Sequence, residues 1–262
     1  RLRATLLAAG ESWIDDPSNR DSRFDRARLR AAASLLADLG LTRDRLTATA
    51  RAMARARSAI DAAVDDALAG AVTIHAAGWA AVNPEILATL PEEIALRLLS
   101  RLVGAIGGAP YGPRLASLEA LAARFLGTDP KATVAARTLS GTRIEQRRGR
   151  LWIAPEIGRD AARLRLEPGT HGRWRGRRIE LAPEAPSAVD LAPLGVDGRR
   201  RLAATGRLTS TMVGTPAPPA AVIESALAVF VDGELVACPG LDPAGATAAK
   251  APIRLRIAPI SP

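Results

Sequence analysis

The sequence is organised around a dense stretch that reads Trp13-Ile14-Asp15-Asp16-Pro17-Ser18-Asn19-Arg20-Asp21-Ser22-Arg23-Phe24-Asp25-Arg26-Ala27-Arg28-Leu29-Arg30. Asp16-Pro17 favours an extended or turn conformation, and the side chains of Ser18 and Asn19 can hydrogen-bond to neighbouring backbone groups. After this turn, Asp21 or Ser22 can cap a helix. The stretch therefore predicts a shaped turn followed by a basic helix.

The local chemistry of this stretch favours a structural corner. Four aspartates lie close in sequence to five arginines, and Arg26 and Arg30 are four residues apart, on one face of the predicted helix. Salt bridges between these groups would hold a helix-loop-helix corner, with Trp13 and Phe24 in its core.

The same stretch also matches a specific pattern. The order Trp-x-x-Asp-Pro-Ser-Asn-x-Asp-x-x-Phe-x-Arg-x-Arg-x-Arg resembles the segment that follows the ATP-binding domain in tRNA(Ile)-lysidine synthetases, which are PP-loop ATPases. In that family the segment usually reads Trp, any residue, Glu, Asp, then Pro or Glu, Ser and Asn, and it ends in Arg-Asn-x-x-Arg. Asp15 stands here in place of the usual Glu, and Ala27 in place of the usual Asn. The matching residues are Trp13, Asp16, Ser18, Asn19, Asp21, Phe24, Arg26 and Arg30.

The resemblance implies an activity for the complete protein. It would ligate free lysine to C2 of the wobble cytidine of the tRNA(Ile) that carries a CAU anticodon. ATP with magnesium, held by the N-terminal domain, would adenylate the cytidine, and the lysine amine would displace AMP. The resemblance also implies that the catalytic cleft is lined or braced by Asp16, Asn19, Arg26 and Arg30. Asp16 would contact the lysine ammonium or orient Arg26, and the two arginines would meet phosphate.

A phosphate-binding loop is absent from the sequence. The Ser-Gly-Gly-x-Asp-Ser loop of the family does not occur, and Ser140-Gly141-Thr142 lacks its second Gly, its Asp and its final Ser. There is also no Walker motif, no G-x-G-x-x-G and no Cys-x-x-Cys. The chain begins at Arg1, without a Met, in what reads as the middle of a helix. We therefore expect a C-terminal portion that binds no cofactor of its own and does not catalyse alone.

The composition of the chain limits the classes of partner that it can bind. The 262 residues suffice for two domains, and a formal net charge of +9 favours an acidic partner such as nucleic acid. Only Lys131 and Lys250 are lysines among the 36 basic residues, so part of the arginine content reflects a GC-rich coding sequence. One cysteine, Cys238, excludes an internal disulfide framework. Because no apolar run reaches the roughly 18–20 residues of a membrane span, we expect a soluble cytoplasmic protein with no membrane partner.

Periodicity predicts an α+β fold with an N-terminal helical domain and a small β-rich domain after it. Apolar spacing predicts helices over residues 24–38, 42–68, 91–106 and 113–125. Alternation predicts strands over residues 133–139, 142–147 and 151–154, and Asp232-Gly233 predicts the turn of a hairpin over residues 229–236. The proline-rich stretches 183–193 and 216–219 predict loops. The predicted division is 1–30 as the tail of the catalytic domain, 31–128 as a helical domain and 129–262 as a β-rich tRNA-binding domain.

Arginine clusters supply the candidate RNA contacts, because guanidinium groups bridge phosphates and an interleaved Trp offers a stacking surface. The candidates are Arg51, Arg55, Arg143, Arg147, Arg173, Trp174 and Arg177. The alternative is a solvated arginine face on the helix and, in the hairpin, an inward Trp174. Trp174-Arg175-Gly176-Arg177 resembles the Trp-Asp-Gly-Arg element of some family members, with Arg175 in place of Asp. His75 has no metal-ligand spacing around it, so we expect a structural role.

Two other functions are consistent with the same residues. One is a non-enzymatic RNA-binding module whose basic faces grip tRNA phosphates, and the other is a structural or interaction protein whose arginine content is genomic bias. Salt-sensitive tRNA binding by this chain separates the first from the second. The sequence leaves the oligomeric state open, with a homodimer among the alternatives.

Overall fold

The computed structural model describes residues 2–12, 14, 21, 23–158, 163–208, 216–241 and 255–257. The chain divides into two compact units, Arg1–Ile60 and Asp61–Pro262. Helices and antiparallel sheets are both present, as the α+β prediction requires. The three-part division predicted from the sequence remains a prediction about its functional organisation.

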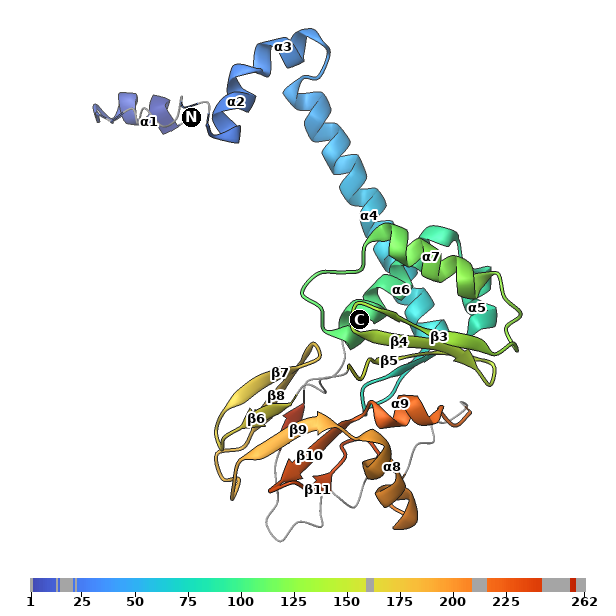
Figure 1. The fold of residues 1–262 in the computed structure, drawn as a ribbon. Helices are drawn as coiled ribbons and strands as arrows, with labels where there is room; N and C mark the ends of the chain where they lie inside the picture. Colours follow the sequence, from blue (N-terminus) through green and yellow to red (C-terminus); the bar gives the residue numbers. More distant parts are fainter. Residues whose placement is uncertain are drawn as a thin grey trace. The chain divides into compact units, whose positions relative to one another are not determined.

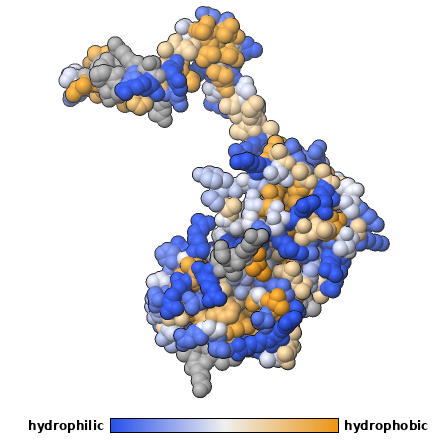
Figure 2. Space-filling view, viewed as in Figure 1, coloured by the Kyte–Doolittle hydropathy of each residue, from blue (hydrophilic) through white to orange (hydrophobic). Residues whose placement is uncertain are grey.

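The first unit is helical and buries few of its large apolar side chains. Its helices are α1 (Leu2–Ala8), α2 (Asp25–Ala31), α3 (Ala33–Asp38) and the first part of α4 (Arg43–Ala71). The single helix predicted over residues 24–38 is interrupted at Ala32, whose ψ of −6° departs from the helical value. Phe24 is 54% exposed and Leu35 is 62% exposed, so the predicted core position of Phe24 is wrong. Hydrophobic residues gather visibly over α2 and α3 (Figure 2).

Helix α4 confirms the long helix predicted from an alanine-rich stretch without Gly or Pro until its end. Only its last part packs. Leu46 and Met53 are exposed, whereas Val64 is fully buried. Among the described residues of α4, buried side chains therefore occur only in the Asp61–Pro262 unit.

The second unit is built on a five-stranded antiparallel sheet in the order β1-β2-β5-β4-β3. Its strands are β1 (Val72–Ile74), β2 (Ala80–Val82), β3 (Val134–Leu139), β4 (Thr142–Arg147) and β5 (Arg150–Pro155). The three predicted strands between residues 133 and 154 are confirmed. The sequence did not predict β2, because Ala80–Val82 is buried on both faces and so shows no alternation.

Helices cover one face of this sheet (Figure 1). They are α5 (Pro84–Thr89), α6 (Glu92–Gly107) and α7 (Leu115–Leu126). Asn83 caps α5 by accepting a hydrogen bond from the backbone N–H of Glu85, and Glu92 and Glu93 occupy the first turn of α6, where the helix dipole favours carboxylates. Leu98, Leu99 and Leu102 of α6 are fully buried. Both helices predicted between residues 91 and 125 are confirmed.

Two smaller sheets follow. The first is ordered β11-β10-β9-β6 and the second β12-β8-β7. Their strands are β6 (Leu164–Leu166), β7 (His171–Trp174), β8 (Arg177–Leu181), β9 (Val189–Pro193), β10 (Leu227–Val231), β11 (Glu234–Ala237) and β12 (Leu255–Ile257). The predicted hairpin is confirmed, because Asp232 and Gly233 both have positive φ, 48° and 83°, between β10 and β11. The loop predicted over residues 183–193 is partly wrong, since β9 is a central strand in which all residues but Asp190 are buried.

Two short helices, α8 (Gly195–Ala204) and α9 (Ala220–Glu224), complete a second core. Trp152 of β5 and Trp79, which directly precedes β2, pack there with Leu202 of α8 and Val222 of α9. The large sheet is thus covered on both faces, which explains why nearly all of β5 is buried. Among the described residues, no helix combines the length and the apolar character needed to cross a membrane.

Candidate nucleic-acid interface

A groove of about 760 Å³ lies along α6 and the tip of the β7–β8 hairpin. Four arginines line it: Arg101 of α6, and Arg173, Arg175 and Arg177 of the hairpin. No aspartate or glutamate is among the described residues that line it. The groove is therefore a concave surface with one sign of charge, which attracts anions.

Small residues on α6 let the hairpin come close. Arg101, Gly104, Ala105 and Gly108 follow the three- and four-residue spacing of one helix face. A Cβ atom on Gly108, whose φ is 71°, would lie only 2.3 Å from the backbone nitrogen of Gly176. A Cβ on Gly176 would lie 2.9 Å from the carbonyl oxygen of Ala105. Both glycines are thus required for the close approach that forms the groove.

The turn of the hairpin places a partly buried arginine at this contact. Arg175 has a positive φ of 43°, and its guanidinium carbon lies 5.9 Å from the centre of the Trp174 ring. Its Nε is buried without a hydrogen-bond partner. Burial lowers the pKa of Arg175, and the nearby charge of Glu156 opposes part of that shift. A cationic group that has lost water and lacks a full set of acceptors gains from an anionic ligand.

Arg177 is held by the loop that joins β1 to β2. Its Nη1 donates a hydrogen bond to the carbonyl oxygen of Ala76 at 3.0 Å, and burial lowers the pKa of the guanidinium. In the same loop, His75 Nδ1 accepts a hydrogen bond from the backbone N–H of Ala77 at 3.1 Å. The His75 ring stacks on Trp79, with centroids 4.2 Å apart, and burial lowers the pKa of His75. This geometry agrees with the structural role predicted for His75.

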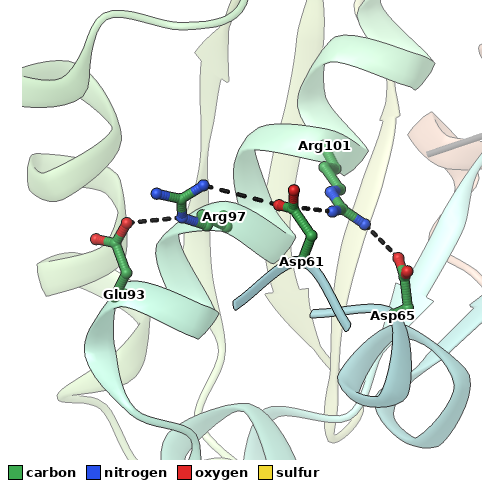
Figure 3. A network of polar contacts seen from close by, with 5 residues as sticks. All are labelled: Asp61, Asp65, Glu93, Arg97 and Arg101. Carbon is green, nitrogen blue, oxygen red and sulfur yellow. Dashed lines mark hydrogen bonds and ion pairs between the residues drawn. The ribbon is translucent and has the colours of Figure 1, made fainter. Parts of the chain in front are cut away.

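Arg101 also forms ion pairs with carboxylates of α4 (Figure 3). Its Nη1 lies 2.5 Å from a carboxylate oxygen of Asp65, and its Nη2 lies 3.2 Å from Asp61. Arg97 lies 3.8 Å from Asp61 and 2.7 Å from Glu93. These five residues form an ion-pair network between α4 and α6. The sequence prediction missed Arg101, although the small residues Gly104, Ala105 and Gly108 that follow it on one face were a usable signal.

Comparison with known proteins shows the family of the chain. A tRNA(Ile)-lysidine synthase from Ruegeria pomeroyi is 35% identical over 219 residues, covering 82% of this chain and 49% of that protein. One from a Methylobacterium strain is 40% identical over 159 residues, covering 60% of this chain and 46% of that protein. The chain belongs to the tRNA(Ile)-lysidine synthase family. It spans about half the length of these relatives, and no family model matches it.

The groove contains only some of the RNA-binding residues predicted for this tRNA(Ile)-lysidine synthase homologue. Arg173 and Arg177 line it. Trp174 takes the inward alternative, because it is only 4% exposed and packs in the hairpin core, so its ring is not available for stacking on a base. Arg143 and Arg147 lie on β4, outside the groove, and Arg143 pairs with Glu145 at 3.3 Å.

The other predicted site residues of the synthase homologue lie in the Arg1–Ile60 unit. Arg51 and Arg55 are exposed, one turn apart on α4. Asp16 and Asn19 lie outside the described residues, and the side chains of Arg26 and Arg30 in α2 are outside them too. Among the described residues, no group of three or more His, Cys, Asp or Glu side chains could hold a metal ion.

Proposed function

We propose that this chain is the C-terminal, tRNA-binding portion of a tRNA(Ile)-lysidine synthase, and that the arginine groove contacts the tRNA backbone. The observation that carries the proposal is the set of four arginines around one groove with no carboxylate among its described lining residues. In the complete protein, the proposed reaction ligates free lysine to the wobble cytidine of tRNA(Ile) at the expense of ATP. The portion described by this sequence would bind and orient tRNA and would not catalyse alone.

The chemistry of the groove suits a phosphodiester backbone. Guanidinium groups donate two parallel hydrogen bonds to phosphate oxygens, and these bonds are stronger than neutral ones. Arg175 and Arg177 are partly dehydrated before any ligand arrives, so less water must be displaced on binding. Trp174 supports the hairpin by packing in its core. The groove therefore recognises backbone charge and shape, and base identity would be read elsewhere.

Direct binding of tRNA tests this proposal. The 262-residue chain is titrated with a tRNA(Ile) transcript carrying a CAU anticodon at several salt concentrations. Each phosphate contact should contribute about −0.7 to −0.9 to the slope of log affinity against log salt. A slope of about −3 or steeper supports a multi-arginine interface. Absence of binding at low salt would favour a structural or interaction protein with genome-biased arginine content.

The residues of the Trp13–Arg30 stretch have a separate proposed role. We propose that Asp16, Asn19, Arg26 and Arg30 line or brace the catalytic cleft of the complete enzyme, with the arginines facing phosphate. An Arg26→Glu substitution in the full-length enzyme should abolish most lysidine formation while leaving tRNA binding by the groove intact. Unchanged lysidine formation would remove Arg26 from the site. Binding without any lysidine formation by the unaltered full-length protein would favour a non-enzymatic RNA-binding module.

A further inference from the structure

Arg101 takes part in two features of the fold, the groove and the ion-pair network with α4. It lines the groove, and it also holds two carboxylates of α4. Its side chain is 28% exposed, whereas that of Asp65 is 68% exposed and that of Asp61 is 38% exposed. No ion pair of Arg173 or Arg175 is among the described contacts of the groove. Arg101 is thus a groove arginine whose charge is already balanced by carboxylates.

We infer that Asp61 and Asp65 compete with the RNA backbone for Arg101 and so hold the affinity of the groove below its maximum. The inference rests on the proposed RNA-binding function and assigns its regulation to these two carboxylates. With Asp65 and Asp61 in place, the guanidinium of Arg101 directs Nη1 and Nη2 at α4. A phosphate at the α6 end of the groove must share or displace those contacts.

The exchange is energetically accessible because the contact with Asp65 is open to solvent. Exposed ion pairs contribute little stability, since water screens them and long side chains lose freedom to form them. A phosphate offers Arg101 a bidentate partner of greater charge. Asp61 is also held by Arg97, 3.8 Å away, so it has a second cation when Arg101 turns to the ligand. Asp65 has only Arg101 among its described ion pairs, and it is the stronger competitor.

The test removes the competing carboxylates without changing the groove. Asp65→Asn should tighten binding of the tRNA(Ile) transcript about twofold to fivefold at low salt, the range expected for one exposed ion pair. The Asp61→Asn/Asp65→Asn double variant should tighten binding further. Asp66→Asn is the matched control, because it removes the neighbouring charge on α4 without an ion pair to Arg101 among the described contacts.

An Arg101→Ala background separates competition from a general charge effect. In that background Asp65→Asn should no longer tighten binding, because the arginine it restrains is gone. Equal tightening with and without Arg101, or equal tightening by Asp66→Asn, would overturn the inference. The proposed function fails differently, since the unaltered chain would then not bind tRNA at all. Thermal unfolding of each variant identifies a change in folding, and affinities are compared at matched folded fraction.

Discussion

Two arginine-rich surfaces of this chain differ in what surrounds them. Arg51 and Arg55 lie on the exposed face of a single helix, within a part of α4 that has no buried residue before Val64. Arg173, Arg175 and Arg177 lie on a hairpin pressed against α6, and two of them are dehydrated enough to have a lowered pKa. The number of arginines alone therefore does not identify a binding surface. What distinguishes the groove is backbone packing that makes it concave.

The largest effect should follow from a change at the glycine contact that makes the groove. Gly108→Ala would place a Cβ 2.3 Å from the backbone of Gly176, at a residue with a φ of 71°. Because the backbone atoms on both sides of this contact cannot move apart without strain, the free energy of unfolding should fall by about 3 kcal/mol. Chemical denaturation measures this change, and binding of tRNA should weaken with it.

Gly104→Ala is the matched control for Gly108→Ala. It lies one turn earlier on the same face of α6, and a Cβ there meets nothing within 4 Å. Because alanine favours a helix more than glycine does, this change should raise the free energy of unfolding by about 0.5–1 kcal/mol. If both substitutions destabilise the protein equally, the close approach of the hairpin to Gly108 is not what holds the groove.

The next effect contrasts the two arginine surfaces directly. Arg173→Ala/Arg175→Ala should weaken tRNA binding about tenfold and reduce the salt slope by about two, because each arginine removed leaves one phosphate unneutralised. Arg51→Ala/Arg55→Ala removes the same charge from the exposed helix and should weaken binding less than about threefold. Titration of the two double variants in parallel measures the contrast. Equal weakening by both would show that net charge alone drives binding and that concavity contributes nothing.

Much of the fold could be predicted because its local signals agree with its tertiary structure. Pro91 and the carboxylates after it define the start of α6, and Asp232-Gly233 defines the β10–β11 turn. The strands between residues 133 and 154 show alternation and turn residues that fit their sheet. Where both faces of a strand are buried, as in β2, alternation disappears and the prediction fails.

The groove could be predicted only in part, because it depends on contacts between distant segments. The density of arginines in the sequence is enough to indicate Arg173 and Arg177. Arg101 lies much earlier in the chain, and its place beside them depends on Gly108 and Gly176 meeting. The burial of Trp174 likewise depends on the hairpin core, since a Trp between arginines is equally compatible with either face. The small residues that follow Arg101 on α6 indicate a close approach, but no local pattern indicates which segment approaches.

The smallest effect concerns the β1–β2 loop, in which the Ala76 carbonyl accepts a hydrogen bond from Arg177. Burial lowers the pKa of His75 in the folded protein below its ordinary value of 6.5, so the unfolded chain binds a proton more readily. The free energy of unfolding should therefore fall as pH drops below about 6.5 and continue to fall until the lower folded pKa is passed. Protonation of Nδ1 would also break its hydrogen bond with the N–H of Ala77. This would weaken the loop conformation that presents the Ala76 carbonyl to Arg177.

Thermal unfolding between about pH 7 and pH 5 measures this linkage. His75→Phe keeps a ring against Trp79 but cannot titrate, so its unfolding temperature should fall less over this range than that of the unaltered chain. The absolute stability of this variant is lower at every pH, because Ala77 loses its hydrogen bond, and only the slope carries the prediction. His171→Asn, at an exposed site on β7, retains His75 and should retain the steeper slope. If the unfolding temperatures of His75→Phe and the unaltered chain fall equally with pH, groups other than His75 cause the loss of stability. The β1–β2 loop would then support Arg177 independently of pH.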